Sequence, residues 1–258
     1  MAPRNSSSLD RPVLRTGRSA ARRTATCGLF VAGTDTGVGK TYVAARIAAA
    51  LAAEGLRVGV YKPAASGCRR LGRFLVSDDA AILWQAAGRP GNLRAVCPQR
   101  FSAALAPHLA AREERKQIDV RLLRSGLDYW RKRSDIVVVE GAGGLMSPIG
   151  ERDYVADLAE EFGYPLVIVA PNRIGTINGT LLTLIAAAAR PQPLSIAGIV
   201  LNDLAPAGSD DPSVALNRLE LETRCVPPVL AQVGYGAASF DAPVDWLRLA
   251  LRNANPAG

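Results

Sequence analysis

The sequence predicts one α/β domain with a mostly parallel, doubly wound β-sheet and helices on both faces. Apolar strands and helices alternate along the chain, and this alternation favours parallel strand pairing through helical crossovers. The run Ile136-Val-Val-Val139 is β-branched throughout, which is typical of a strand that is covered on both faces. A glycine-rich turn joins the first strand to the first helix. A sheet of this kind binds its ligands beyond the carboxyl ends of the strands.

Each expected element rests on a local pattern. The first strand is the apolar run 29–32, and the Ala-rich segment 40–54 after the glycine-rich turn is a helix. The second strand, 57–62, ends before Pro63. Residues 63–77 and the proline-containing stretch 90–107 are expected to be irregular. Further strands are expected at 135–140, 166–170, 196–201 and 229–233, and further helices at 78–87, 108–116, 119–131, 153–162, 179–189, 211–223 and 244–252.

Positive charge is concentrated at the start of the chain. Residues 1–26 contain six Arg and one Asp, a net +5 of the total of +8. We expect these residues to form a disordered basic extension and residues 27–254 to form the single folded domain. The extension lacks the apolar core of a secretory signal. An organelle transit peptide and a nucleic-acid-binding tail are the weaker alternatives.

Neither hydropathy nor cysteine usage indicates a membrane protein or a disulfide scaffold. No apolar run reaches the ~18 residues that span a bilayer. The four cysteines at positions 27, 68, 97 and 225 are far apart and form no C-x-x-C pair. This spacing argues against zinc and against disulfides, and it fits a reducing compartment. We therefore expect a cytoplasmic protein.

The segment Gly33-Thr-Asp-Thr-Gly-Val-Gly-Lys-Thr41 is the most specific motif in the chain. A glycine-rich turn before a helix directs backbone N–H groups and the positive end of the helix dipole toward one point, where phosphate binds. Lys40 is expected to reach the β- and γ-phosphates of a nucleoside triphosphate, and the Thr41 hydroxyl is expected to bind Mg²⁺. The strict pattern has glycine at position 34, where this chain has Thr34. The second half of the motif is intact, so a P-loop NTPase type of fold is expected.

Polar residues at the ends of three other strands are candidates for the rest of the site. Glu140 follows a buried strand, and Mg²⁺ prefers such hard oxygen ligands. Lys62 ends the second strand, where it could stabilise charge on a transferring phosphoryl group, although a solvated loop lysine has the same spacing. Asn202 and Asp203 offer donors and acceptors to a nucleobase edge, but such residues also form turns.

Five motifs resemble, in order, those of the dethiobiotin synthetase family, over about residues 28–237. The resemblance implies an ATP-dependent enzyme that carboxylates 7,8-diaminononanoate with CO₂ and closes the ureido ring, releasing ADP and phosphate. A carbamate oxygen would attack the γ-phosphate, and the second amine would then displace phosphate from the mixed anhydride. The motifs are Gly33-Thr-Asp-Thr-Gly-Val-Gly-Lys-Thr41, Tyr61-Lys-Pro-Ala-Ala-Ser-Gly67, Ala106-Pro-His-Leu-Ala-Ala111, Val139-Glu-Gly-Ala-Gly-Gly144 and Leu201-Asn-Asp203.

The resemblance also implies the roles of individual residues. Lys62 and Lys40 would flank the carbamate and the γ-phosphate in catalysis. Mg²⁺ would be bound by Thr41, Asp79 and Glu140, with Asp78 as a rival of Asp79. The diamine would contact Thr36, Ser66, Gly144 and Asn178, and the family forms a homodimer that holds the substrate carboxylate across its interface. ATP would be held by Gly37, Val38, Gly39, Lys40, Thr41, Tyr42, Asp79, Glu140, Gly141, Ala142, Gly143, Asn202, Asp203, Gly234, Tyr235 and Gly236.

The chain departs from the family at one position of the phosphate loop. Position 37 is often glutamate in the family and is glycine here, so any acidic contribution from that position is absent. The main alternative function is a dimeric P-loop ATPase switch of the partition type. Such ATPases carry a lysine early in the phosphate loop, where this chain has Asp35. A nucleic-acid-binding function would leave Lys62 and Glu140 without a role.

Overall fold

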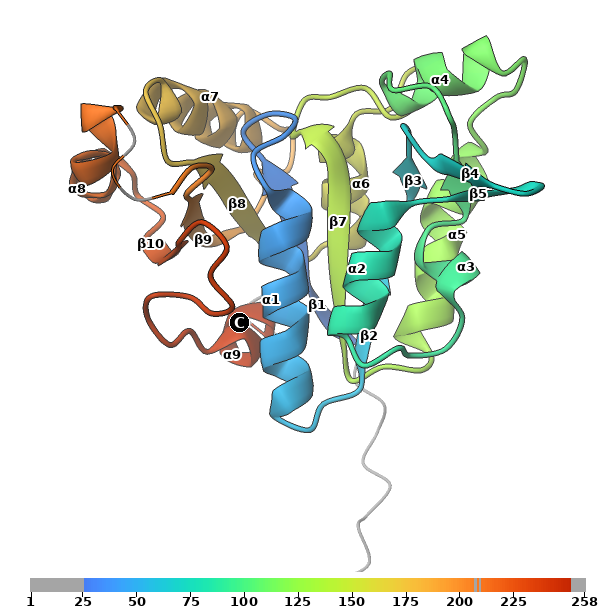
Figure 1. Ribbon diagram of the computed structural model, residues 1–258, viewed down its shortest axis with the longest axis horizontal. Coiled ribbons are helices and arrows are strands. Elements are labelled where there is room, and N and C mark those ends of the chain that lie inside the picture. Colours follow the sequence, from blue (N-terminus) through green and yellow to red (C-terminus); the bar gives the residue numbers. More distant parts are fainter. Residues whose placement is uncertain (1–25, 207, 209, 252–258) are drawn as a thin grey trace, which may run out of the picture.

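The computed structural model describes residues 26–206, 208 and 210–251, so nearly all of the predicted extension lies outside the described residues. Its centre is a six-stranded sheet in the order β10-β9-β8-β1-β7-β2, with every neighbouring pair parallel (Figure 1). The α/β fold and the parallel sheet predicted from the sequence are confirmed. The strands are β1 (Cys27–Gly33), β2 (Val58–Tyr61), β7 (Ile136–Gly144), β8 (Leu166–Pro171), β9 (Ile196–Asn202) and β10 (Val229–Val233).

Helices connect these strands and cover the sheet, with α1 in front of it and α6 behind it in Figure 1. None of the helices within the described residues is long and apolar enough to cross a bilayer. The helices are α1 (Lys40–Ala53), α2 (Asp78–Ala86), α3 (Leu93–Val96), α4 (Pro107–Glu113), α5 (Val120–Arg131), α6 (Val155–Phe162), α7 (Thr176–Ala188), α8 (Asn217–Arg224) and α9 (Trp246–Leu251), with a 3₁₀ turn at Pro212–Ala215.

The core lies between the sheet and the apolar faces of the helices. The segments 29–32 of β1 and 136–139 of β7 are completely buried, as their apolar runs predict. On α1, Val43, Ile47 and Leu51 recur at the spacing of one helical face, and all three are completely buried. Because these central elements pack on both sides, they hold the residues at their ends in fixed positions.

The order of the strands predicts a ligand-binding crevice next to β1. The chain passes from β1 to β2 on one side and later from β7 to β8 on the other side, so the direction of winding changes at β1. Open α/β sheets bind ligands at such a switch point. The pairing of β1 with β7 shifts register between Val31 and Gly33, and Gly33 pairs with Gly144. The glycines that end β7 therefore lie beside the phosphate loop.

Two segments differ from the sequence-based expectation. The stretches expected to be irregular contain short strands: β3 (Ala64–Ala65) pairs with β6 (Gln99–Arg100), and β4 (Arg69–Leu71) forms a hairpin with β5 (Phe74–Val76). Strands of two or three residues are too short to show a sequence period. The expected helix 211–223 is divided into the 3₁₀ turn and α8, because Asn217 Nδ2 bonds Asn172 Oδ1 at 3.0 Å and anchors the start of α8.

Candidate active site

The backbone between β1 and α1 forms a phosphate cradle. Gly37 (φ 75°) and Gly39 (φ 90°) have left-handed conformations, which favour glycine. Gly39 caps α1, and neither a side-chain cap nor an acidic residue in the first turn satisfies the first N–H groups of the helix. These N–H groups are therefore available to an anion. The Lys40 ammonium donates to the carbonyl of Asp35 at 2.9 Å, which holds this side chain against the same turn.

The end of β9 packs directly against this turn. A Cβ atom at Gly39 would lie only 2.0 Å from Nδ2 of Asn202, so no side chain fits there. Asn202 Nδ2 donates to the carbonyl of Val38 at 3.0 Å, and this bond fixes the orientation of its amide. Asn202 Oδ1 is buried and has no hydrogen-bond partner. It is thus an acceptor that a ligand donor, such as the amino group of a nucleobase, can satisfy.

Lys62 forms an ion-pair cluster just beyond the carboxyl end of β2, beside Glu140 in β7. Its Nζ lies 2.6 Å from Glu140 Oε1 and 2.8 Å from Asp79 Oδ2. Burial by itself lowers the pKa of Lys62, but the two carboxylates outweigh that effect and raise it above its usual value. Burial raises the pKa of Asp79, and the Lys62 ammonium reverses this shift and holds the pKa below its usual value. Lys62 and Asp79 therefore both carry their charges at neutral pH.

The start of α2 separates the two neighbouring aspartates. The Ser77 hydroxyl accepts a hydrogen bond from the third helical N–H, as an N-cap residue does. In the helical turn that follows, Asp79 points to Lys62, whereas Asp78 pairs with Arg69 of β4 at 2.6 Å on the exposed side. Asp79 lines the cavity beside the phosphate loop, and Asp78 does not.

The oxygen atoms around Thr41 fit a magnesium ion. The Thr41 hydroxyl donates to Glu140 Oε1 at 2.8 Å, and it also helps to lower the pKa of the Asp79 carboxyl. Glu140 Oε2 is buried and has no partner. Mg²⁺ typically takes one or two carboxylates together with phosphate oxygens and waters. A site of this kind has only two carboxylate ligands. Among the described residues, no cluster of three His, Cys, Asp or Glu side chains suited to a metal occurs.

A single cavity of about 470 Å³ joins the phosphate loop to the Lys62 cluster. Burial lowers the pKa of Lys40, which lines this cavity, to about 8, while the charge of Glu140 opposes that shift. The structure brings Lys40, Lys62 and Glu140 together, although they lie far apart in the sequence. The wall consists of Thr36, Gly37, Gly39, Lys40, Thr41, Tyr42, Arg46, Lys62, Ala65, Ser66, Asp79, Ile82, Glu140, Ala142 and Gly143.

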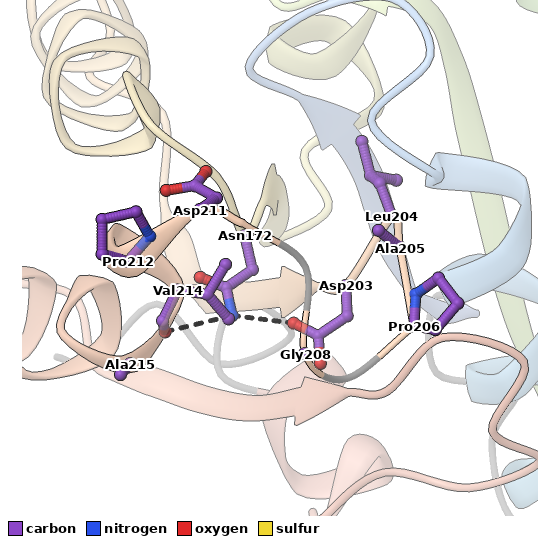
Figure 2. Close-up of a pocket in the computed structure, with 10 residues that line it drawn as sticks. All are labelled: Asn172, Asp203, Leu204, Ala205, Pro206, Gly208, Asp211, Pro212, Val214 and Ala215. Atoms are coloured by element: carbon purple, nitrogen blue, oxygen red, sulfur yellow. Dashed lines mark hydrogen bonds between the residues drawn. The ribbon is translucent and has the colours of Figure 1, made fainter.

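A second cavity of about 310 Å³ opens beyond the end of β9. Figure 2 shows Asn172 between Asp203 and Val214, with hydrogen bonds to both. Both oxygens of Asp203 accept from Gln232 Nε2 at 3.0 Å, and Oδ1 also accepts from Asn172 Nδ2 at 2.7 Å. Asp203 therefore fastens the ends of β8, β9 and β10 to one another, while Asn202 keeps its acceptor free.

Comparison with known sequences identifies the family to which this chain belongs. Residues 27–238 match a family described as an AAA domain, AAA_26. An ATP-dependent dethiobiotin synthetase BioD from Rhodopirellula baltica is 44% identical over 79% of this chain and 82% of its own length. The protein of the same name from Aromatoleum aromaticum is 37% identical over 83% of this chain and 93% of its own length. The chain belongs to the dethiobiotin synthetase family. The family membership predicted from the motifs is thus confirmed.

Solved structures with this fold include partition ATPases. A ParA family ATPase from Chlorobium tepidum has a TM-score of 0.51 at 18% identity, covering 82% of this chain and 85% of its own. A plasmid partition protein from Borrelia burgdorferi has a TM-score of 0.52 at 13% identity, covering 89% of this chain and 96% of its own. At these identities the likeness concerns the P-loop fold alone. It does not extend the partition function to this member of the dethiobiotin synthetase family.

Some residues expected to contact ligands lie outside the main cavity. Gly141 is buried, and a Cβ there would meet Val155 at 2.8 Å, so it faces the core. Val38 is also buried, a Cβ at Gly144 would lie 3.3 Å from the carbonyl oxygen of Thr34, and Asn178 is exposed in the first turn of α7. None of these residues lines the main cavity. They contribute backbone next to it or belong to the neighbouring surface.

The turn at Gly234, Tyr235 and Gly236 is attached to α1 through the next residue. The carbonyl of Ala237 accepts from the Tyr42 hydroxyl at 2.7 Å and from Nε of Arg46 at 2.7 Å. Arg46, Asn172 and Gln232 were not among the residues predicted from the sequence. Arg46 follows Tyr42 by one helical turn, and Gln232 lies in β10 next to the predicted glycines, so both had positional signals.

Proposed function

We propose that this protein makes dethiobiotin from 7,8-diaminononanoate, CO₂ and ATP, releasing ADP and phosphate. The family membership supports the reaction. The observation that carries the proposal for this chain is the meeting of Lys40, Lys62 and Glu140 in one cavity beside an uncapped helix. The partners in the proposal are the diamine, CO₂, ATP and a second copy of the chain, and nucleic acid has no part in it.

The phosphate loop would bind the triphosphate of ATP. Its N–H groups and the Lys40 ammonium supply positive charge, and the glycines allow phosphate oxygens to approach the backbone. The free Oδ1 of Asn202 would accept from the adenine amino group, and Gly234 to Gly236 would border the base. In this arrangement Asp203 acts mainly through Asn172 and Gln232, which it holds in place.

Thr41, Asp79 and Glu140 would hold Mg²⁺. Bound Mg²⁺ would neutralise charge on the β- and γ-phosphates. Both carboxylates contact Lys62 at 2.6–2.8 Å, so a metal on these oxygens would compete with the lysine. The ammonium group would then be free to turn toward the γ-phosphate and the carbamate.

Lys62 and Lys40 would stabilise the charge that develops during phosphoryl transfer. The carbamate oxygen forms a bond to the γ-phosphorus while the bond to the leaving ADP oxygen breaks. The second amine then attacks the carbonyl carbon, phosphate leaves with the C–O bonding electrons, and the amine loses a proton. Neither step needs a covalent enzyme intermediate, so positioning and fixed positive charge carry the catalysis.

The start of α7 and the glycines of β7 would hold the other end of the diamine. Thr36 and Ser66 line the cavity and are placed to bond the amines or the carbamate. Thr176 Oγ1 and Thr180 Oγ1 are buried without partners near the uncapped start of α7, and Gly179 lies beside Thr34. Asn178 and the backbone at Gly144 would complete a carboxylate site there.

A second copy of the chain would cover α7. This helix, Thr176–Ala188, contains no charged residue, yet Leu182 and Ile185 are 57% and 63% exposed. An apolar helix face of this kind favours an interface. We expect a dimer by light scattering and a shift toward monomer in Ile185→Glu. A wild-type monomer at micromolar concentration would remove the homodimer from the proposal.

A coupled assay of ADP release tests the reaction. ATP turnover should depend on both 7,8-diaminononanoate and bicarbonate, and mass spectrometry should detect dethiobiotin in an amount equal to the ADP formed. Turnover that is indifferent to the diamine would instead favour the ATPase switch. The Ile185→Glu variant in the same assay shows whether the reaction needs the dimer.

A further inference from the structure

Arg46 places a positive charge on the wall of the nucleotide cavity that no carboxylate balances. It lies on α1 and lines the cavity with Tyr42 and the phosphate loop. Its guanidinium bonds only to backbone carbonyls: Nε and Nη2 donate to Ala237 O, and Nη1 donates to Tyr42 O at 3.0 Å. Within the described part of the chain, the ion pairs do not include Arg46, whereas Lys62 in the same cavity has two carboxylate partners.

The Arg46 side chain extends toward the phosphate loop. Helical side chains tilt toward the N-terminus of their helix, and the bond to Tyr42 O shows that the guanidinium reaches back one turn. The guanidinium carbon lies 3.1 Å from the centre of the Tyr42 ring, so the two groups stack. This contact holds the Arg46 guanidinium near the first turn of α1. Seen from the phosphate loop, the guanidinium lies beyond Lys40.

The donors around Ala237 O exceed what that oxygen can accept. A carbonyl oxygen has two lone pairs, yet the Tyr42 hydroxyl and two N–H groups of Arg46 all point to it. Two of the five guanidinium N–H groups take no part in the bonds to Ala237 and Tyr42. The surplus of donors and the unbalanced charge both favour an anionic ligand at this place.

Arg46 adds to the cavity wall a cation that is not part of the phosphate loop. Lys40 belongs to the loop and is assigned to the β- and γ-phosphates by its motif. Arg46 lies farther along α1 and contacts Ala237 in the 234–237 turn, which would border the base in the proposed function. We propose that Arg46 binds the phosphate next to the ribose and, through Ala237, couples that phosphate to the position of the 234–237 turn. This inference rests on the proposed function only in taking a nucleotide as the ligand.

Calorimetric titration with ADP, AMP and adenosine tests this assignment. Arg46→Gln should weaken ADP and AMP binding about tenfold or more, because a charge-assisted hydrogen bond to phosphate is lost. Adenosine affinity should stay within about twofold of wild type, because adenosine has no phosphate. Arg46→Lys keeps the charge and should recover part of the AMP affinity. In steady state, KM for ATP should rise while KM for the diamine stays unchanged.

Arg133 provides a matched control. It follows Tyr129 by four residues, donates to Tyr129 O at 3.2 Å and stacks 4.2 Å from that ring, but it lies before the amino end of β7. Arg133→Gln should leave all three affinities unchanged. Thermal melting of both Gln variants verifies that they fold, and Arg46→Lys serves as the test if Arg46→Gln does not fold.

Two results would overturn the assignment. Unchanged ADP and AMP affinities in Arg46→Gln would show that Arg46 binds no phosphate. Equal weakening of adenosine and AMP would show that Arg46 only supports the turn. The wild-type assay with the diamine is read separately: nucleotide binding that depends on Arg46 without dethiobiotin formation would refute the proposed function and leave this inference standing.

Discussion

The two ends of β2 and β7 carry the same kind of ion pair in very different surroundings. At the amino ends, Arg57 and Asp135 meet at 2.5 Å, and the arginine side chain is 72% exposed. Toward the carboxyl ends, Lys62 after β2 and Glu140 within β7 meet at 2.6 Å, and both side chains are at least 94% buried, with exposed fractions of 6% and 1%. The strands pair in register between these positions, from Val58 with Ile136 onward.

The comparison teaches how to recognise a functional ion pair. Exposed pairs are solvated and contribute little to stability. A buried pair loses hydration, and its polar atoms normally all find partners. Glu140 Oε2 has none, although it is buried. An incompletely satisfied charge in the interior is thus better explained by a ligand than by stability, whereas the outer pair needs no ligand.

The largest expected effect follows from removing the buried cation. Lys62→Ala should retain ATP binding but lower turnover about 100- to 1,000-fold, because the charge that stabilises the transferring phosphoryl group is lost. Single-turnover kinetics and ATP titration measure the two quantities separately. Near-normal turnover in this variant would exclude Lys62 from the mechanism. The buried ion pair would then be no more important for function than the exposed pair of Arg57 and Asp135.

The buried anion should show the next largest effect. Glu140→Gln keeps the volume of the side chain but removes a carboxylate from the oxygen cluster with Thr41. Apparent Mg²⁺ affinity should fall at least about 10- to 100-fold, the range seen when even an outer partner of a metal ligand is lost. Activity titrated with Mg²⁺ at fixed ATP measures the change. Unaltered Mg²⁺ dependence would contradict the assignment of Glu140.

The neighbouring aspartates of α2 form a matched pair. Both lie in the first helical turn, where a negative charge is favourable to a similar extent, but only Asp79 faces the cavity. Asp79→Asn should raise KM for Mg-ATP about tenfold, and Asp78→Asn should change it less than about twofold. Equal effects of the two substitutions would show that the helix dipole, rather than contact with the ligand, matters here.

The smallest effect is expected at the amino ends. Arg57→Gln should leave KM and turnover unchanged and lower the melting temperature by at most about 3 °C at pH 7. Arg57 holds the pKa of Asp135 below its usual value. The ion pair therefore contributes its full stabilisation above the pKa of about 3.9 that an aspartate has in the unfolded chain. This stabilisation is lost as pH falls through the pKa of Asp135 in the folded protein. Melting curves at pH 7 and pH 3 should show the difference shrinking; a difference that grows at pH 3 would contradict this.

Local sequence pattern predicts many of the residues that line the candidate site. The phosphate loop is a contiguous motif whose glycines have the backbone conformations it requires. Lys62 follows β2, Glu140 follows the apolar run 136–139 of β7, and the parallel pairing of the two strands places these residues side by side. The short strands at 64–65 and 99–100 escaped prediction, because two residues contain no period. The break at Leu216 was not predicted either, because Asn217 makes its anchoring contact with Asn172, which lies 45 residues earlier, directly after β8.

The sequence by itself determined the fold, the phosphate loop and the family, because these depend on residues adjacent in the chain or on strand order. The tertiary structure decided which aspartate faces Lys62, why Gly39 must lack a side chain above Asn202, and that Arg46 meets Ala237. These contacts join side chains on separate elements. Their geometry depends on how the elements pack, and neither sequence periodicity nor composition determines the distances between these side chains.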